Sequence, residues 1–295
     1  MPRGSAGKNA EMDRAEFNAL HMPALEQNEV RHNLLLGLMS QVSPGPAADE
    51  MRRWTLGGAG ACAIQTSANR GVILGDLEQA QCRVLAEEVY GSVFAGAIGP
   101  GNTAPWFVER AIELGLSFGS ALPQMIHELR EPPVYPGAPG KARRATADDL
   151  GWVFGWMAAF HAEAVPDDPP VIPEEVARKL KERVVLFWEA GGEPVSMAGL
   201  ARSTRNAAAI GPVYTPPEFR ARGYAGSVTA ALVEFIFASG KTAACLYTNL
   251  LNPYSNRCYA KIGFKPVCES WHYHRIGSRA GDDAVRQHDD LENSQ

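Results

Sequence analysis

A proline-rich segment near the middle of the chain constrains the possible folds most. Residues 131–140 read EPPVYPGAPG, with four prolines and two glycines. Because proline fixes φ and removes a backbone donor, this segment cannot continue a helix or lie inside a sheet. The break predicts an N-terminal domain over residues 1–130, a linker over 131–140 and a C-terminal domain over 141–276. Residues 277–295 are polar, and we expect this tail to be disordered.

Composition excludes several classes of protein. The 295 residues are 45% hydrophobic and 21% charged, which is typical of globular proteins. With 28 Lys and Arg against 33 Asp and Glu, there is no basic excess for a nucleic-acid partner. Neither a membrane-spanning run nor a signal peptide is evident, so we expect a cytoplasmic protein without a membrane partner. The five cysteines include no C-x-x-C pair, which predicts reduced thiols and no metal site.

The two halves of the sequence follow a similar order of predicted elements. The C-terminal half predicts a strand at 142–146, helices at 148–164 and 172–183, strands at 184–189, 194–202 and 207–215, a helix at 223–239, a strand at 243–248, a helix at 254–262 and a strand at 267–276. The N-terminal half predicts helices within 11–40, strands at 52–56, 61–66 and 72–74, a helix at 78–90, a strand at 92–98, a helix at 104–114 and a strand at 116–129. We interpret this order as an internal duplication. Chance is the alternative, because hairpins followed by βαβ units are common.

A strand, a turn and a long helix in the second half form a candidate anion site. The turn carries Arg220, Arg222, Gly223, Ala225 and Gly226. The first N–H groups of a helix have no internal partner, and the helix dipole places positive charge there. The small residues allow a diphosphate to approach the backbone, and the two arginines add positive charge. The alternative is an ordinary turn that contains a glycine.

This turn resembles a known cofactor loop. The string VYTPPEFRARGYA over residues 213–225 resembles the acetyl-coenzyme A loop of the GNAT acyltransferases, whose pattern is Gln/Arg-x-x-Gly-x-Gly/Ala. The string LYTNLLNPYSNRCYAKIGF over residues 246–264 resembles the next strand and helix of the same superfamily, closest to its FR47-like branch. The resemblance implies an α/β fold with a mixed sheet and two GNAT-like domains in tandem. It covers the C-terminal half well and the N-terminal half in outline.

The resemblance also implies which residues hold coenzyme A. The strand around Tyr214 would diverge from the strand at 243–248, and the pantetheine arm would lie between them, bonded to the backbone of Val213 and Thr215. The pyrophosphate would be held by backbone N–H groups of Arg220, Ala221, Arg222, Gly223, Tyr224, Ala225 and Gly226. On the next helix, Asn252 would bond the pantetheine or orient the helix, and Ser255 or Asn256 would lie near the cofactor.

Tyr259 is the catalytic residue that the resemblance implies. Its hydroxyl would point at the thioester sulfur. A phenol of pKa near 10 can donate a proton to a developing thiolate, whose own pKa is near 8.5. The alternative role for Tyr259 is packing in the core.

The general base is left open. Many GNAT enzymes carry a glutamate in the strand before the loop, but residues 207–214 contain no acid. Ordered water is one alternative, and the candidate side chains are Glu163, Glu189, His161, His272 and His274. Cys245 and Cys258 are less favoured as nucleophiles, because direct transfer needs none.

The predicted function is transfer of an acetyl group from acetyl-coenzyme A to the amine of a small molecule, by a monomer or homodimer. Asp167 and Asp168 either attract a cationic amine or form a solvated turn. In the N-terminal half, Asp76 and Glu78 stand where the arginines stand in the other, so we expect a degenerate copy that binds no diphosphate. The alternative functions are an acyl-coenzyme A sensor or scaffold without turnover, and transfer to a protein or aminoacyl acceptor.

Overall fold

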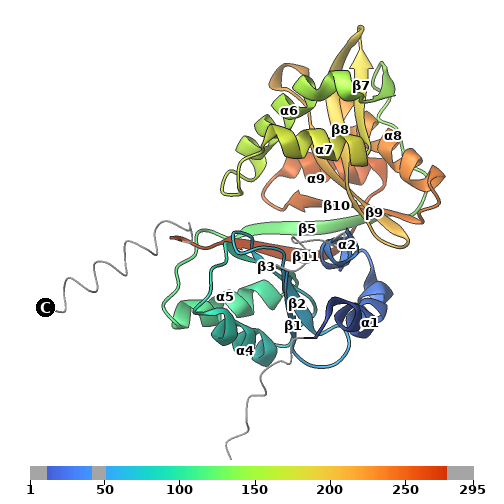
Figure 1. The fold of residues 1–295 in the computed structure, drawn as a ribbon. Coiled ribbons are helices and arrows are strands. Elements are labelled where there is room, and N and C mark those ends of the chain that lie inside the picture. The colour runs from blue at the N-terminus through green and yellow to red at the C-terminus, as the bar shows by residue number, and fades with distance from the viewer. Residues whose placement is uncertain (1–11, 42–50, 278–295) are drawn as a thin grey trace, which may run out of the picture. The chain divides into compact units, whose positions relative to one another are not determined.

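The computed structural model describes residues 12–41 and 51–277, and the chain divides into two compact units (Figure 1). The first unit extends to Gln124 and takes in the residues from Glu269 onward, whereas the second comprises Met125–Cys268. The chain therefore enters the second unit within β5 (Leu122–Leu129) and leaves it within β11 (Lys265–His274). The tail expected over residues 277–295 lies outside the described residues, except for residue 277.

The second unit is a mixed sheet with helices on both faces. Its strand order is β5-β10-β9-β8-β7-β6, antiparallel from β6 to β9 and parallel between β9 and β10. The elements after β5 are β6 (Lys141–Arg144), α6 (Leu150–Ala164), α7 (Pro173–Glu182), β7 (Val185–Ala190), β8 (Glu193–Ser203), β9 (Ala207–Tyr214), α8 (Tyr224–Ala238), β10 (Ala243–Asn249) and α9 (Pro253–Ile262). Each lies within a few residues of its predicted range.

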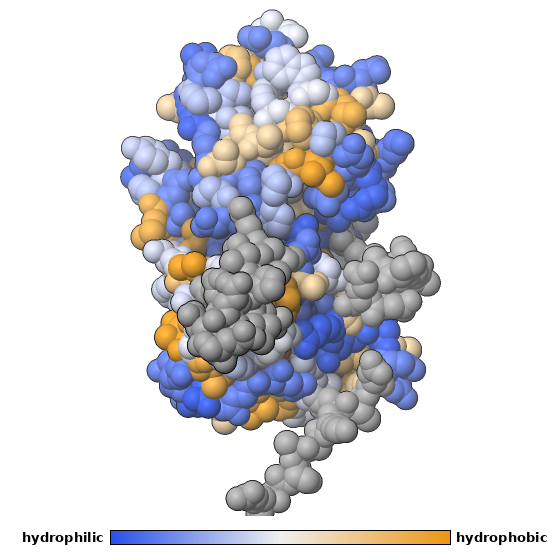
Figure 2. Space-filling view, turned by 60° about the vertical axis from the view of Figure 1, so that its left-hand side comes forward, coloured by the Kyte–Doolittle hydropathy of each residue, from blue (hydrophilic) through white to orange (hydrophobic). Residues whose placement is uncertain are grey.

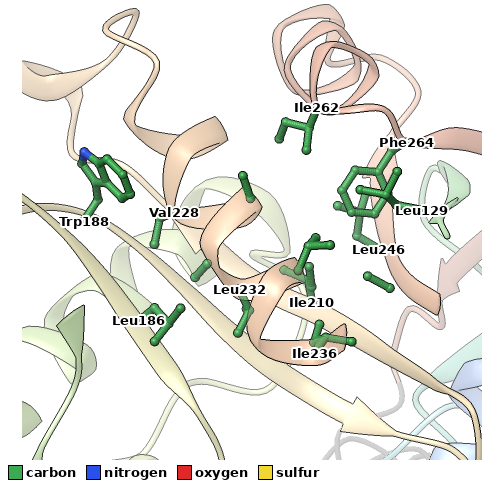
Figure 3. Close-up of a cluster of buried hydrophobic side chains, with 14 of the residues drawn as sticks. Leu129, Leu186, Trp188, Ile210, Val228, Leu232, Ile236, Leu246, Ile262 and Phe264 are labelled. Carbon is green, nitrogen blue, oxygen red and sulfur yellow. The ribbon is translucent and has the colours of Figure 1, made fainter. Parts of the chain in front are cut away.

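Two hydrophobic clusters fill the two faces of this sheet. Helices α8 and α9 cover one face, and their apolar side chains pack against the strands (Figure 3). This cluster includes Leu129, Leu186, Trp188, Ile210, Val228, Leu232, Ile236, Leu246, Ile262 and Phe264. Helices α6 and α7 cover the other face with a second cluster that includes Trp156, Val176, Phe187 and Tyr214. The sequence also predicts Phe235 on the buried face of α8. It is 37% exposed, because it lies one residue round the helix from buried Ile236.

The described elements of the first unit follow the order that α6 to α9 follow in the second, without a counterpart of β6. They are α1 (Arg14–Leu25), α2 (Asn33–Gln41), β1 (Arg52–Thr55), β2 (Cys62–Gln65), β3 (Val72–Leu74), α4 (Gln79–Val89), β4 (Gly96–Pro100) and α5 (Thr103–Glu113). Helices α1 and α2 pack on one face of its strands, and α4 and α5 pack on the other. Strand β11 pairs antiparallel with β4. The predicted α/β class with a mixed sheet is confirmed in both units.

Residues 131–140, which we call the strap, belong to the second unit. The Val134 N–H donates to the Ile262 carbonyl over 2.9 Å, and the Tyr135 hydroxyl donates to Glu234 over 2.8 Å. At the other end, Trp188 Nε1 donates to the Pro139 carbonyl over 2.9 Å. The segment that the sequence predicts as a linker is thus fastened across α8, from the end of α9 to β7. Proline prevents regular structure here but does not prevent docking.

Among the described residues, none of the helices combines the length and the hydrophobicity that crossing a bilayer requires. On the face drawn in Figure 2, hydrophobic side chains lie in small groups between hydrophilic ones. Isolated apolar groups of this kind are ordinary on protein surfaces.

Candidate functional site

Strands β9 and β10 pair only near their beginnings. Their register joins Ala207, Ala208 and Ala209 to residues 243–245, and no pairing between the two strands is found beyond this point. Strand β9 nevertheless continues to Tyr214, and β10 continues to Asn249. Each residue of a strand carries one N–H and one C=O, so the divergence leaves backbone groups that the neighbouring strand does not satisfy. An extended polar molecule could bond to them, as the sequence resemblance implies.

The turn between β9 and α8 has an unusual backbone. Ala221 has φ of 62°, and Gly223, at the N-cap of α8, has φ of 82°. A left-handed conformation costs an alanine about 1 kcal/mol, so the surrounding chain must hold it. Backbone strain of this kind concentrates at ligand-binding sites. The turn leads into the first N–H groups of α8, where the helix dipole favours an anion.

The strap packs closely against Gly226. A Cβ on Gly226 would lie 2.6 Å from Pro136 Cγ and 3.5 Å from Cys258 Sγ. A Cβ on Gly223 would meet Pro136 and Ala138 at 3.4 Å, which is an ordinary contact. The strap and α9 thus occupy the position that a Gly226 side chain would take, and the approach of a diphosphate to the Gly226 backbone stays a prediction. Gly223 owes its identity to its positive φ.

The two arginines of the turn differ in their surroundings. Arg220 Nη2 lies 2.7 and 2.8 Å from the two carboxylate oxygens of Glu163, and Arg220 Nε donates to the Thr215 carbonyl over 2.9 Å. The Tyr214 hydroxyl donates to the same carboxylate over 3.3 Å. Arg222 is exposed, and no hydrogen bond or ion pair of its guanidinium is found within the described chain. Thus one expected cation is compensated by Glu163, and the other faces solvent.

Asn252 begins helix α9. Its Oδ1 accepts hydrogen bonds from the backbone N–H groups of Tyr254 and Ser255, at 3.1 and 3.2 Å. Pro253 at the first helical position suits this arrangement, because its missing N–H would have had no partner there. The Ser255 hydroxyl donates to the Asn252 carbonyl over 3.1 Å. The structure therefore gives Asn252 the orienting role, and a contact with pantetheine stays a prediction.

One turn further along α9, the protein leaves a polar group unsatisfied. Asn256 Nδ2 donates to the Asn249 carbonyl over 3.2 Å, which joins α9 to the end of β10. Its Oδ1 is buried, and no partner for it is found in the described chain. A buried acceptor without a partner is unfavourable, so this atom suits a donor from a ligand.

Tyr259 follows Asn256 by three residues and shares its side of the helix. It is partly buried, and its ring packs edge-on against Phe264 with 6.0 Å between centroids. No hydrogen bond of its hydroxyl is found among the described residues. Burial raises the pKa of Tyr259, so the hydroxyl remains a proton donor at neutral pH. The packing role holds for the ring, which leaves the hydroxyl for other contacts.

The five candidate bases lie in different surroundings. Glu189 is bonded to Arg143 at 2.6 Å, and His161 Nε2 donates to the Asp168 carbonyl at 2.9 Å. His272 and His274 are on β11 within the first unit, with 4.2 Å between their ring centroids. Glu163 is the candidate whose observed hydrogen bonds reach both β9 and the turn.

The cysteines are free thiols in the described chain, as predicted. Burial raises the pKa of Cys258, and Cys245 is buried in β10. Both features disfavour the thiolate that a nucleophile requires. Direct transfer therefore remains the simpler chemistry.

The first unit reverses the charges found around Arg220. Asp76, in the turn after β3, accepts three hydrogen bonds from Arg31 Nε and Nη2, and His32 Nε2 lies 3.0 Å from it. Burial by itself would raise the pKa of Asp76, but the bonds from His32 and Arg31 outweigh it and lower the pKa. The carboxylate is therefore ionised at neutral pH. An anion in this turn would repel a diphosphate.

The sequence interpretation misses two contacts around this site. It does not join Glu163 to Arg220, although it names both, because 57 residues separate them. It also misses His127 on β5, whose Nε2 lies 3.0 Å from Thr248 Oγ1 and whose Nδ1 is buried without a partner in the described chain. No local pattern marks a pair 121 residues apart.

Comparison with known proteins supports the resemblance. Residues 191–276 match the model of the FR47-like protein family. Among curated proteins, none matches this sequence. A GCN5-related N-acetyltransferase from Kribbella flavida superposes with a TM-score of 0.58 at 16% identity, covering 86% of this chain and 97% of its own.

Two further solved structures cover most of the chain. A Drosophila protein gives a TM-score of 0.62 at 13% identity, over 90% of this chain and 94% of its own. An acetyltransferase of the GNAT family from Colwellia psychrerythraea gives 0.50 at 11% identity, over 86% and 97%. At these identities the structures establish the fold. The predicted fold class is thus confirmed: the chain has the fold of the GNAT acetyltransferases. Residues 191–276 are similar to the FR47-like protein family, as the sequence resemblance predicts, and the tandem arrangement stays a prediction.

Proposed function

We propose that this protein is an N-acetyltransferase that transfers an acetyl group from acetyl-coenzyme A to the amine of a small molecule. The divergence of β9 and β10 carries the proposal, because the end of β9 does not pair with β10 beside the strained turn and the start of α8. In a sheet protein, backbone that is left unpaired in this way indicates a ligand.

The residues present fit coenzyme A. In the proposed arrangement, the backbone of Val213 and Thr215 bonds the pantetheine arm, and the N–H groups of residues 220–226 bond the diphosphate. Exposed Arg222 adds a charge-assisted contact to the diphosphate. The unsatisfied Asn256 Oδ1 can accept a hydrogen bond from an amide of the arm. Gly226 takes part through its backbone N–H, because the position that a Cβ would occupy lies against the strap.

Coenzyme A supplies an acyl group on a thioester, whose sulfur leaves as a thiolate. In the proposed mechanism, Tyr259 holds its proton toward that sulfur and donates it as the carbon–sulfur bond breaks. The raised pKa of Tyr259 keeps the proton on the hydroxyl at neutral pH. The amine must lose a proton, and Glu163 is the candidate acceptor with contacts to β9. No cysteine takes part.

A screen for thiol release tests the proposal. Acetyl-coenzyme A and the protein are mixed with amines, amino acids, aminoglycosides and polyamines, and free thiol is measured. The expected result is release that depends on both the protein and one class of amine.

The absence of an acid from residues 207–214 favours a second candidate, a sensor that binds acyl-coenzyme A without turnover. Calorimetry separates the two functions. Binding of acetyl-coenzyme A with no thiol release over the whole panel supports the sensor, whereas absence of binding contradicts both.

A further inference from the structure

Arg220 has one anionic partner in the protein, Glu163, and the proposed ligand would bring a second, its diphosphate. We infer that Glu163 and the diphosphate of coenzyme A compete for the Arg220 guanidinium, so that cofactor binding releases the Glu163 carboxylate. The inference rests on the proposed function, because it assumes that a diphosphate binds at the turn.

The position of Glu163 makes it dependent on its partner. It is one residue from the end of α6, where the helix dipole places negative charge. A carboxylate there is disfavoured unless a cation compensates it. Arg220 does so with one nitrogen on both carboxylate oxygens, at 2.7 and 2.8 Å. The ion pair therefore offsets the unfavourable interaction of Glu163 with the helix dipole, and it adds no net stability to α6.

The pair is open to exchange. The side chains of Arg220 and Glu163 are 45% and 49% exposed, so water screens their attraction. Pairs of this exposure contribute at most about a fivefold effect on an equilibrium. A diphosphate offers several charged oxygens, and the first turn of α8 and exposed Arg222 would bind it at the same time. The diphosphate is therefore the stronger partner for Arg220.

Exchange has a consequence for the acceptor. A released Glu163 would retain its bond from the Tyr214 hydroxyl but would have lost its cation. An unpaired carboxylate at a helix C-terminus attracts a new cation, and an alkylammonium acceptor supplies one. The inference therefore predicts that cofactor binds before acceptor and that the acceptor is a positively charged amine.

Calorimetry on the full chain tests the competition without requiring the acceptor. Coenzyme A and pantetheine, which lacks the diphosphate, are each titrated into the wild-type protein and the Glu163→Gln variant. Glu182→Gln is the matched control, because Glu182 forms a similarly exposed pair with Arg178 on α7. We expect Glu163→Gln to bind coenzyme A about two- to fivefold more tightly and pantetheine unchanged, and the control to behave as wild type.

Three results overturn the inference. The first is an unchanged or weaker affinity of Glu163→Gln for coenzyme A, in a variant whose melting temperature shows that it is folded. The second is an equal gain for pantetheine, which would place the effect outside the diphosphate. The third is persistence of the gain when Arg220 is also changed to alanine, because the competition requires that side chain. If wild type fails to bind coenzyme A at all, the proposed function itself fails.

Discussion

Replacement of Tyr259 by phenylalanine separates the two roles of this residue. The change removes the hydroxyl and retains the ring that packs against Phe264. If the hydroxyl donates to the leaving sulfur, turnover falls by about 100-fold, the low end of what general acid catalysis contributes. Affinity for coenzyme A remains near that of wild type, because the binding contacts lie elsewhere.

The structure also predicts the stability of this variant. The Tyr259 hydroxyl has no observed hydrogen bond in the described chain, so phenylalanine removes no bond. Among the described residues, the hydroxyl is also not one of the buried atoms that lack a partner, so its removal is expected to change the free energy of unfolding by less than about 0.5 kcal/mol. Tyr259→Leu is the control. It also removes the aromatic contact with Phe264, worth about 0.5–1.5 kcal/mol, and lowers stability.

The assay combines thiol release under single-turnover conditions with urea unfolding. Single turnover makes the chemical step visible even where product release limits the steady state. Full activity of Tyr259→Phe with chemistry rate-limiting would refute the assignment. Loss of stability equal to that of Tyr259→Leu would show that the hydroxyl serves the fold.

Two further predictions concern stability. Hydrogen bonds from Arg143 lower the pKa of Asp149 to about 2. Because this folded pKa lies below the unfolded value, the stabilisation is present above pH 4 and is lost as the pH falls toward 2. Asp149→Asn should therefore lower the free energy of unfolding by about 2 kcal/mol at pH 7 and by little near pH 2, as measured by urea unfolding. A variant whose stability depends on pH as that of wild type does would contradict this. Gly226→Ala should lower the free energy of unfolding by about 1–3 kcal/mol, because its Cβ would clash with Pro136. Gly155→Ala has open space around the new Cβ and should raise it by up to about 1 kcal/mol. Equal melting temperatures of the two variants would refute the strap contact.

The sequence predicted the elements of the second unit because each carries a local signal. Helix α8 carries apolar residues at helical spacing and ends before Gly240, and α9 begins with Asn252-Pro253. The signals that mark each helix lie within that helix or beside its ends, so they can be found in the sequence without the fold. They also locate the turn that contains Gly223, whose φ of 82° accounts for a glycine there.

Contacts between distant segments could not be predicted in this way. The strap reads as a linker because its prolines exclude helix and strand, but its docking depends on Gly226 and Trp188, which lie far along the chain. Likewise, Arg220 reads as a free cation until the fold places Glu163 beside it. Nor does any local pattern predict that β5 is the neighbour of β10 in the sheet.

The most direct test of the central claim is a calorimetric titration with coenzyme A. We predict one molecule bound per chain, because the turn of the first unit carries Asp76 in place of arginine. Gly223→Glu should abolish binding by placing an anion at the start of α8. Gly223→Ala has the same backbone strain at a φ of 82° but adds no charge, so it should bind coenzyme A more tightly than Gly223→Glu does. Absence of binding to wild type, or unchanged affinity in Gly223→Glu, would contradict the account.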